Sequence, residues 1–245
     1  AASVGSSHLF SEVRFINKLM FFLYPDLVQL DLLMTQQNTT TLIAIAGPSA
    51  SGKSLLCETI YQELLTELGP NGISIIKEDA YYRDQAHIAM DARINTNYDH
   101  PNAFEHELLG SHLTALVNQK SINCPVYCYK THTRTHEVTN INPTKVILIE
   151  GILLLSSPKL RNTFDIKIYM DTPLDICLIR RIERDTKERE RSLESITNQF
   201  LSTVRPMYHQ FIEPSKAWAD IVINHGGKNR MAIELLKAKI RQLSK

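Results

Sequence analysis

The stretch that decides the fold reads Gly47-Pro48-Ser49-Ala50-Ser51-Gly52-Lys53-Ser54. It matches the pattern G-x-x-x-x-G-K-[ST] of a phosphate-binding loop. Its glycines let the backbone turn tightly and approach a polyphosphate closely. Its N–H groups form an anion-binding nest at the positive end of the following helix. We therefore predict a site for nucleotide phosphates, with Lys53 on the outer phosphates and Ser54 offering a hydroxyl to Mg²⁺.

The residues on both sides of this loop have the patterns that the motif requires. Leu42-Ile43-Ala44-Ile45-Ala46 is a short apolar run typical of a buried strand. Apolar residues between Leu55 and Glu67 recur at helical spacing. This strand–loop–helix context argues against a chance match in a glycine turn. The residues predicted to bind the phosphates are Gly47, Ser49, Ser51, Gly52, Lys53 and Ser54.

Length and composition bound the kind of protein. A chain of 245 residues is one domain, or one domain with appendages. A net charge of +1 implies no general affinity for polyanions, so nucleic acid is not expected as a partner. The four cysteines form no C-x-x-C pair, which favours a reducing cytoplasm. No uncharged apolar stretch reaches roughly 18 residues, so we expect no membrane span.

Residues 1–40 fit the rest of the chain poorly. The apolar segment Leu19–Leu33 is interrupted by Pro25 and two aspartates, and it lacks the small-residue cleavage site of a signal peptide. We expect an N-terminal extension over residues 1–40, outside the core, with the functional protein beginning near Met34. An interfacial or partner-binding helix is the alternative. Residues 41–245 are then predicted to form the nucleotide-binding domain.

Further apolar runs predict the other strands of a sheet. They are Ile73–Lys77, Val146–Gly151, Ile166–Asp171 and Ile221–Ile223. Because such runs alternate with helical segments, we predict an α/β fold in which a parallel sheet carries helices on both faces.

Three of these strands end in, or are directly followed by, acidic residues, and those of the first two bear on the site. Ligands of open α/β sheets gather at the carboxyl ends of the strands. Asp79 follows the run 73–77, where a carboxylate can orient an attacking hydroxyl and accept its proton. A turn or helix-capping aspartate is the alternative. Glu150 ends its strand in the manner of a Walker B element, and can help to hold Mg²⁺.

Two further segments have recognisable patterns. Residues 122–129 and 134–138 are predicted to pair as a β-hairpin. Residues 173–211 are predicted to be helical, and they carry Arg180, Arg181, Arg184, Arg189 and Arg191. Interleaved acidic residues allow a merely solvated helix. In a protein that handles phosphates, these arginines instead favour a mobile lid that screens developing charge and excludes water.

Together these motifs resemble the uridine kinase (uridine-cytidine kinase) family of P-loop kinases, in its bacterial form, from about Thr41 to the C-terminus. The phosphate-binding loop alone is generic, and the ordered set is much more specific. The segments that carry the resemblance are the loop itself, Glu78–Tyr82, Asn97-Tyr98-Asp99-His100-Pro101, Pro125–Tyr127, His132–Arg134, Glu150–Leu153, Arg180–Asp185 and Phe211–Lys216.

The resemblance implies phosphoryl transfer from ATP or GTP to the 5′-hydroxyl of uridine or cytidine, giving UMP or CMP in pyrimidine salvage. It implies Mg²⁺ as cofactor and a homotetramer. The implied catalytic residues are Asp79 as the base, Lys53 and Arg184. The implied metal ligands are Ser54, Asp79 and Glu150.

The resemblance also assigns the substrate side. Asp99 is implied to bind the ribose hydroxyls, and Tyr127 and His132 the pyrimidine ring. The full set implied to bind the nucleoside is Asp79, Tyr98, Asp99, Tyr127, His132, Arg181 and Gln199, and the set facing phosphates is Arg184, Arg189 and Arg191.

Two positions depart from the family pattern. The lid motif R-G-R reads Arg189-Glu190-Arg191 here, which brings a negative charge close to a phosphate site. Cys128 stands where eukaryotic members often have aspartate, so no role of that acid carries over.

Other readings of the motifs stay open. One is a related P-loop small-molecule kinase of the phosphoribulokinase or pantothenate kinase type, against which the hairpin and the N-Y-D-H-P segment argue. Another is a non-catalytic nucleotide switch. The sequence has no N-K-x-D motif after the loop, and a switch does not need Asp79 beside an arginine lid.

Overall fold

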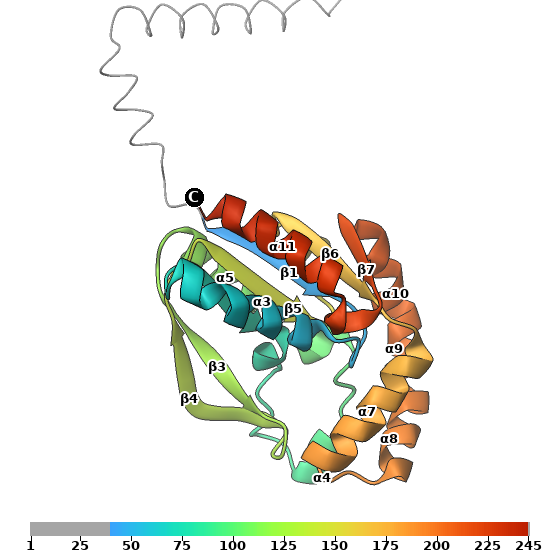
Figure 1. Cartoon of the computed structure of the whole chain (residues 1–245). Coiled ribbons are helices and arrows are strands. Elements are labelled where there is room, and N and C mark those ends of the chain that lie inside the picture. The colour runs from blue at the N-terminus through green and yellow to red at the C-terminus, as the bar shows by residue number, and fades with distance from the viewer. Residues whose placement is uncertain (1–39, 245) are drawn as a thin grey trace, which may run out of the picture. The chain divides into compact units, whose positions relative to one another are not determined.

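The computed structural model of the chain describes residues 40–244, and Figure 1 shows how the helices and strands are arranged. The strands are β1 (Thr41–Ala46), β2 (Ile73–Lys77), β3 (Ile122–Cys128), β4 (Thr133–Ile141), β5 (Val146–Gly151), β6 (Ile166–Asp171) and β7 (Ile221–Asn224). The α-helices are α3 (Lys53–Leu68), α4 (Met90–Ile94), α5 (His106–Val117), α6 (Pro158–Arg161), α7 (Leu174–Glu188), α8 (Leu193–Gln199), α9 (Arg205–Met207), α10 (Glu213–Ser215) and α11 (Arg230–Leu243).

Short helical turns complete these elements. The 3₁₀ turns are η1 (Glu78–Tyr81), η2 (Pro101–Ala103), η5 (Lys216–Trp218) and η6 (Gly226–Lys228). Two π-helical turns, η3 (Phe200–Val204) and η4 (Tyr208–Ile212), flank α9.

The central sheet is parallel throughout, in the strand order β2-β5-β1-β6-β7. This confirms the predicted parallel sheet. The register pairs Glu150 of β5 with Ile45 of β1 on one side and with Lys77 of β2 on the other. Three strands therefore bring their carboxyl ends together where the phosphate-binding loop begins.

Each face of the sheet has its own apolar core, which confirms helices on both faces. On one face, Ile43 and Ile45 of β1 pack with residues of α3 and α11. On the other, Leu42 and Ala44 pack with α5, η1 and the segment after β5. Successive strand residues point to opposite faces. The central strands are thus buried on both sides and read as continuous apolar runs.

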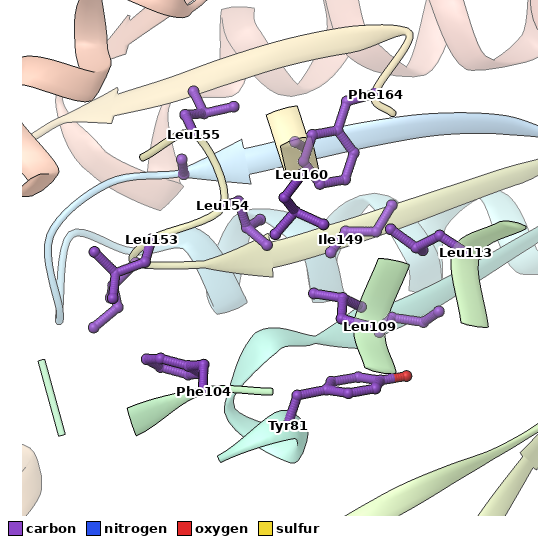
Figure 2. Packing of buried hydrophobic residues seen from close by; sticks show 14 of the residues in the cluster. Tyr81, Phe104, Leu109, Leu113, Ile149, Leu153, Leu154, Leu155, Leu160 and Phe164 are labelled. Atoms are coloured by element: carbon purple, nitrogen blue, oxygen red, sulfur yellow. The ribbon is translucent and has the colours of Figure 1, made fainter. Parts of the chain in front are cut away.

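The second core fixes the segments that surround the candidate site. Figure 2 shows Ile149 of β5 beside Leu109 and Leu113 of α5, with Tyr81 of η1 close by. All four side chains are fully buried. The position of η1 therefore depends on packing against the sheet and not on its own short turn.

Ile149→Ala is expected to lower the free energy of unfolding by about 2–5 kcal/mol, because it removes buried methyl groups and leaves a cavity. Urea unfolding followed by circular dichroism measures the change. The control is Leu201→Ala, since the Leu201 side chain is 62 % exposed and its truncation should change the free energy by less than about 0.5 kcal/mol. Equal effects of the two variants would contradict the described core.

The predicted helix over residues 173–211 is wrong in one respect, because it is interrupted between α7 and α8. Ser192 caps α8 by accepting a hydrogen bond at its Oγ from the Ser195 N–H, at 3.1 Å. Glu190 adopts the left-handed conformation at φ 55°. Glycine takes that conformation without strain, so the structure gives a physical reason for the glycine of the family's R-G-R motif.

The hairpin is present and longer than predicted. β3 and β4 pair antiparallel, and β4 continues to Ile141 where the sequence pattern predicted an end at Val138. The side chains from Thr135 to Asn140 are exposed, so they lack the alternation of buried and exposed residues that marks a half-buried strand.

The expected N-terminal extension lies outside the described residues, apart from Thr40. That residue is buried, and its Oγ1 donates to the Leu116 carbonyl at 3.4 Å. Among residues 40–244, no helix is both long and apolar enough to cross a membrane.

Candidate active site

The phosphate-binding loop joins β1 to α3, and its glycines are required by geometry. Gly47 has a φ of 144° and Gly52 a φ of 101°, which L side chains rarely adopt. A Cβ on Gly52 would lie 2.5 Å from the backbone nitrogen of Gly227. Only glycine therefore permits both the curl of the loop and its contact with the segment before α11.

Two side chains of the loop suit it to bind an anion. The Lys53 Nζ donates to the carbonyls of Gly47 and Pro48, at 3.0 and 2.8 Å. Burial lowers the pKa of Lys53, and the carboxylates of Glu150 and Asp79 oppose this shift. The Ser51 Oγ is buried without a hydrogen-bond partner among the described residues. The first N–H groups of α3 also have no partner within the helix, so the loop presents several donors to one region.

Ser54 and Glu150 meet at the mouth of the loop. The Ser54 Oγ donates to Glu150 Oε1 at 2.7 Å. Burial raises the pKa of Glu150, while the nearby Lys53 ammonium opposes the rise. No group of three His, Cys, Asp or Glu side chains within residues 40–244 forms a complete metal cage. The pair instead fits the way Mg²⁺ is held in kinases, by few protein oxygens together with substrate phosphates.

Asp79 lies in η1, directly after β2. Its carboxylate makes no capping contact within η1, but its Oδ2 accepts a hydrogen bond from the Tyr129 hydroxyl at 2.7 Å. This removes the alternative of a helix-capping aspartate. Desolvation of the Tyr129 hydroxyl, on a side chain whose surface is otherwise partly exposed, and the neighbouring Asp79 carboxylate raise the pKa of Tyr129, so the phenol stays protonated and acts as the donor.

The residue before Asp79 holds η1 in place. Glu78 is fully buried; its Oε1 lies 2.7 Å from His106 Nε2, and its Oε2 accepts from the Leu153 N–H at 2.9 Å. A Cβ on Gly151 would lie 2.2 Å from Glu78 Oε2. The end of β5 must therefore be glycine for Glu78 to fit, and the anchored Glu78 fixes the direction of Asp79.

A pocket beside Asp79 gathers all seven residues predicted to bind the substrate. It lies between η1, the hairpin and the ends of α7 and α8. The predicted residues that line it are Ser49, Asp79, Tyr98, Asp99, Tyr127, His132, Arg181, Arg184, Arg189, Arg191 and Gln199, and Tyr82, Tyr129 and Ile152 complete it. In Figure 1 the hairpin and α7 approach this region from opposite sides of the molecule.

A second hollow adjoins the phosphate-binding loop. It is lined by Ala50, Gly52, Lys53, Ser54, Leu55, Arg180 and Arg184. Arg184 lines both hollows, so this residue is shared by the phosphate-binding loop and the pocket beside Asp79. A group passing from one hollow to the other would meet this side chain.

Aromatic rings form one wall of the pocket. Tyr98 stacks on His132 with centroids 5.3 Å apart, and Tyr82 packs on Tyr127 at 4.9 Å. Burial lowers the pKa of His132, and the arginines Arg191 and Arg189 lower it further. The imidazole is therefore neutral at neutral pH and offers one donor and one acceptor. Such a wall suits a flat heterocycle with polar edges.

Asp99 and Arg181 lie in the deep part of the site. Burial raises the pKa of Asp99, and the Arg181 guanidinium opposes the rise. Arg181 donates to Ser49 Oγ at 3.2 Å and to Gln199 Oε1 at 2.9 Å. Gln199 also accepts from Arg191 Nη1 at 2.7 Å. Ser49, predicted on the phosphate side, thus also contacts the substrate side through Arg181.

Tyr129 and Tyr82 are the residues that sequence reasoning missed. Tyr129 links the hairpin to Asp79 and lies 4.4 Å from the Arg189 guanidinium. β3 ends at Cys128, so Tyr129 lies in the turn after the strand, beside the Tyr127 ring at 5.4 Å between centroids, and strand periodicity alone does not assign it to the site. Tyr82 comes three residues after Asp79, a spacing that brings side chains together on a 3₁₀ turn.

Comparison with known proteins supplies independent evidence. Residues 42–232 match the phosphoribulokinase / uridine kinase family. The chain is 58 % identical over 201 residues to a uridine kinase of Shewanella piezotolerans, covering 82 % of this chain and 95 % of that protein. It is 52 % identical over 212 residues to a uridine kinase of Vibrio cholerae, covering 86 % of this chain and all of that protein.

Solved structures agree in fold. A putative fructose transport system kinase from Silicibacter superposes with a TM-score of 0.65 at 20 % identity, over 76 % of this chain and 91 % of that one. A possible uridine kinase from Bacillus stearothermophilus gives a TM-score of 0.54 at 18 % identity, over 76 % of this chain and 89 % of that one. At these identities the likeness establishes the P-loop kinase fold alone.

Proposed function

The chain belongs to the phosphoribulokinase / uridine kinase family, and from this premise we propose that it is a uridine kinase. It transfers the γ-phosphoryl group of a nucleoside triphosphate to the 5′-hydroxyl of uridine or cytidine. The observation that carries the proposal is the position of Asp79. Its carboxylate faces a pocket walled by Tyr98 and His132, and that pocket adjoins the phosphate-binding loop through Arg184.

We propose ATP or GTP as the donor, with Mg²⁺. Ser51, Lys53 and the loop N–H groups would hold the phosphates, while Ser54 and Glu150, with Asp79 nearby, would hold the metal. When bound, Mg²⁺ neutralises charge that develops on the phosphates. Phosphoryl transfer needs little covalent chemistry from the protein, so positioning and electrostatics provide most of the acceleration.

The remaining residues of the site have separate roles in the proposed reaction. Asp79 orients the 5′-hydroxyl and accepts its proton. Asp99 binds the ribose hydroxyls, and Tyr127 and His132 contact the pyrimidine. Arg184, which lines both hollows, would stabilise the charge on the transferring phosphoryl group.

An acceptor panel tests this function. Purified protein with Mg²⁺ and ATP or GTP is offered uridine, cytidine, pantothenate and ribulose 5-phosphate, and nucleoside diphosphate release is measured. We expect turnover with uridine and cytidine alone. Turnover of pantothenate or ribulose 5-phosphate with none of uridine would overturn the assignment.

Tyr129→Phe is expected to lower kcat about tenfold, equivalent to about 1.4 kcal/mol in the barrier. The variant removes the hydrogen bond that holds Asp79, while the ring that faces Arg189 remains. Hydrogen bonds to charged groups contribute about 1.5–3 kcal/mol, and the low end applies because Tyr129 is 41 % exposed. Steady-state kinetics with uridine measures the change, and Tyr61→Phe, outside the pocket, is the control. Wild-type kcat in Tyr129→Phe would show that Asp79 does not need this contact.

The homotetramer is also a proposal. Exposed apolar side chains gather on β7 and α11, including Val222, Met231 and Leu235. Light scattering coupled to gel filtration gives the mass, and a monomer at micromolar concentration would contradict it.

A further inference from the structure

Four lid arginines surround one buried carboxylate. Asp185 of α7 is completely buried. Its Oδ1 lies 2.8 Å from Arg184 Nε and 3.7 Å from Arg189 Nη1. Its Oδ2 lies 3.5 Å from Arg191 Nη1 and 3.7 Å from Arg181 Nε. All four arginines line the pocket beside Asp79, and Asp185 does not.

The backbone of Asp185 is part of the same arrangement. Its carbonyl accepts a hydrogen bond from the Arg191 N–H at 3.1 Å. This bond turns the chain back after α7 ends at Glu188. Asp185 thus fixes the backbone of the interruption between α7 and α8 as well as the side chains that flank it.

One carboxylate cannot satisfy four guanidinium groups. Each guanidinium has five N–H donors, whereas a carboxylate offers about four acceptor sites. The Arg181 Nε is buried without a hydrogen-bond partner among the described residues. Asp185 is the one carboxylate that contacts all four arginines, and Asp79 and Asp99 line the same pocket, so four positive charges against three carboxylates still leave a local excess of one. The cluster is therefore held together, yet it keeps charge and donors for an anion.

Guanidinium groups bind carboxylate and phosphate oxygens in the same geometry. Without Asp185, the four arginines would repel one another and their long side chains would spread. With it, all four converge beside the pocket that contains Asp79, and Arg184 also lines the hollow at the phosphate-binding loop. The carboxylate therefore keeps them close together before a phosphate arrives.

We propose that Asp185 is a positioning residue for phosphoryl transfer, which holds Arg181, Arg184, Arg189 and Arg191 convergent so that they can bind the transferred phosphoryl group. The role rests on the proposed kinase function. Asp185 itself touches neither substrate. It acts through the arginines, whose surplus donors face the anion.

Asp185→Asn tests the role, because it removes the charge and keeps the size. We expect kcat to fall about tenfold to hundredfold, since misplaced donors no longer stabilise the transition state. The Kd of a non-hydrolysable ATP analogue, measured by calorimetry, should not rise by more than about threefold, because the net positive charge of the site increases. Glu188→Gln is the matched control: it removes a carboxylate from an exposed position of the same helix and should change neither quantity.

Two results would overturn the role. One is wild-type kcat in Asp185→Asn. The other is a parallel loss of kcat and nucleotide affinity, which a merely structural ion pair produces. If Asp185→Asn does not fold, Asp185→Glu tests the positioning role instead. This variant keeps the charge but displaces the carboxylate by one methylene. A tenfold lower kcat with unchanged Kd supports the role, and wild-type kcat contradicts it.

Failure of the proposed function is a separate outcome. The wild-type protein and Glu188→Gln report on the function through the acceptor that they phosphorylate. The ratio of Asp185→Asn to wild type is measured with that same acceptor, so it reports on Asp185 alone.

Discussion

Asp79→Asn is expected to lower kcat by about 10²–10⁴-fold, the usual contribution of a positioned general base. Asparagine keeps the shape and can still receive the Tyr129 hydrogen bond, but it cannot accept the proton of the 5′-hydroxyl. Nucleotide binding should survive, since Lys53, Ser51 and Ser54 are untouched. Steady-state kinetics with uridine gives kcat, and calorimetry with an ATP analogue gives Kd.

Asp91→Asn is the control for this variant, because Asp91 lies exposed on α4, away from the phosphate-binding loop. It should retain wild-type kcat and Kd. If Asp79→Asn kept more than about half of the wild-type turnover, Asp79 would not be the base, and a water or another carboxylate would have to accept the proton.

Lys53→Ala is expected to lower kcat about 10³-fold and to weaken binding of the ATP analogue at least tenfold. Removing a preorganised charge beside a transferring phosphoryl group costs about 10²–10³ in kcat, and Lys53 also contributes to binding before transfer. The variant leaves Glu150 buried without its nearest cation, so the pKa of Glu150 should rise further. The two effects together separate Lys53 from Asp79, whose loss should affect kcat alone.

Lys53→Arg sharpens this test. It preserves the charge, but the ammonium lies between the carbonyls of Gly47 and Pro48, and a planar guanidinium does not match that position. We expect Lys53→Arg to be nearly as impaired as Lys53→Ala, while Lys187→Ala on the exposed side of α7 keeps wild-type kinetics. Full activity of Lys53→Arg would mean that charge alone matters at this position.

The elements around the phosphate-binding loop could be predicted because their signals are local. β1 and β5 are buried on both faces, so each is a continuous apolar run. Gly47 and Gly52 take backbone angles that other residues avoid, and the motif records that requirement directly. Asp79 and Glu150 could be placed near the loop from the sequence alone, because each follows or ends a strand whose carboxyl end faces the loop.

The lid could not be predicted in the same way, although its contacts are local, because the sequence does not show that this face of the helix is buried and that its arginines share one carboxylate. Asp185 looks in the sequence like one acid among the mixed charges of a solvated face. The structure instead buries it completely among four arginines. The left-handed turn at Glu190 had one signal, the glycine that the family's R-G-R motif has there, although glutamate itself gives no sign of that conformation.

The contact between Tyr129 and Asp79 could not be predicted from the sequence for a different reason. Its position on the hairpin follows from the strand pattern, but its bond to Asp79 requires that the hairpin tip fold over η1. No spacing within the hairpin contains that information. It arises from tertiary packing, where Tyr82 and Tyr127 join the two segments.

Product identity tests the central claim most directly. The wild-type protein is incubated with Mg²⁺, uridine and ATP labelled in the γ-phosphate, and the products are separated by chromatography. We expect the label in UMP, and no label transferred to the nucleoside when 5′-deoxyuridine replaces uridine, because the accepting hydroxyl is then missing. Label in inorganic phosphate alone, or equal labelling of the 5′-deoxy acceptor, would contradict a kinase that acts on the 5′-hydroxyl beside Asp79.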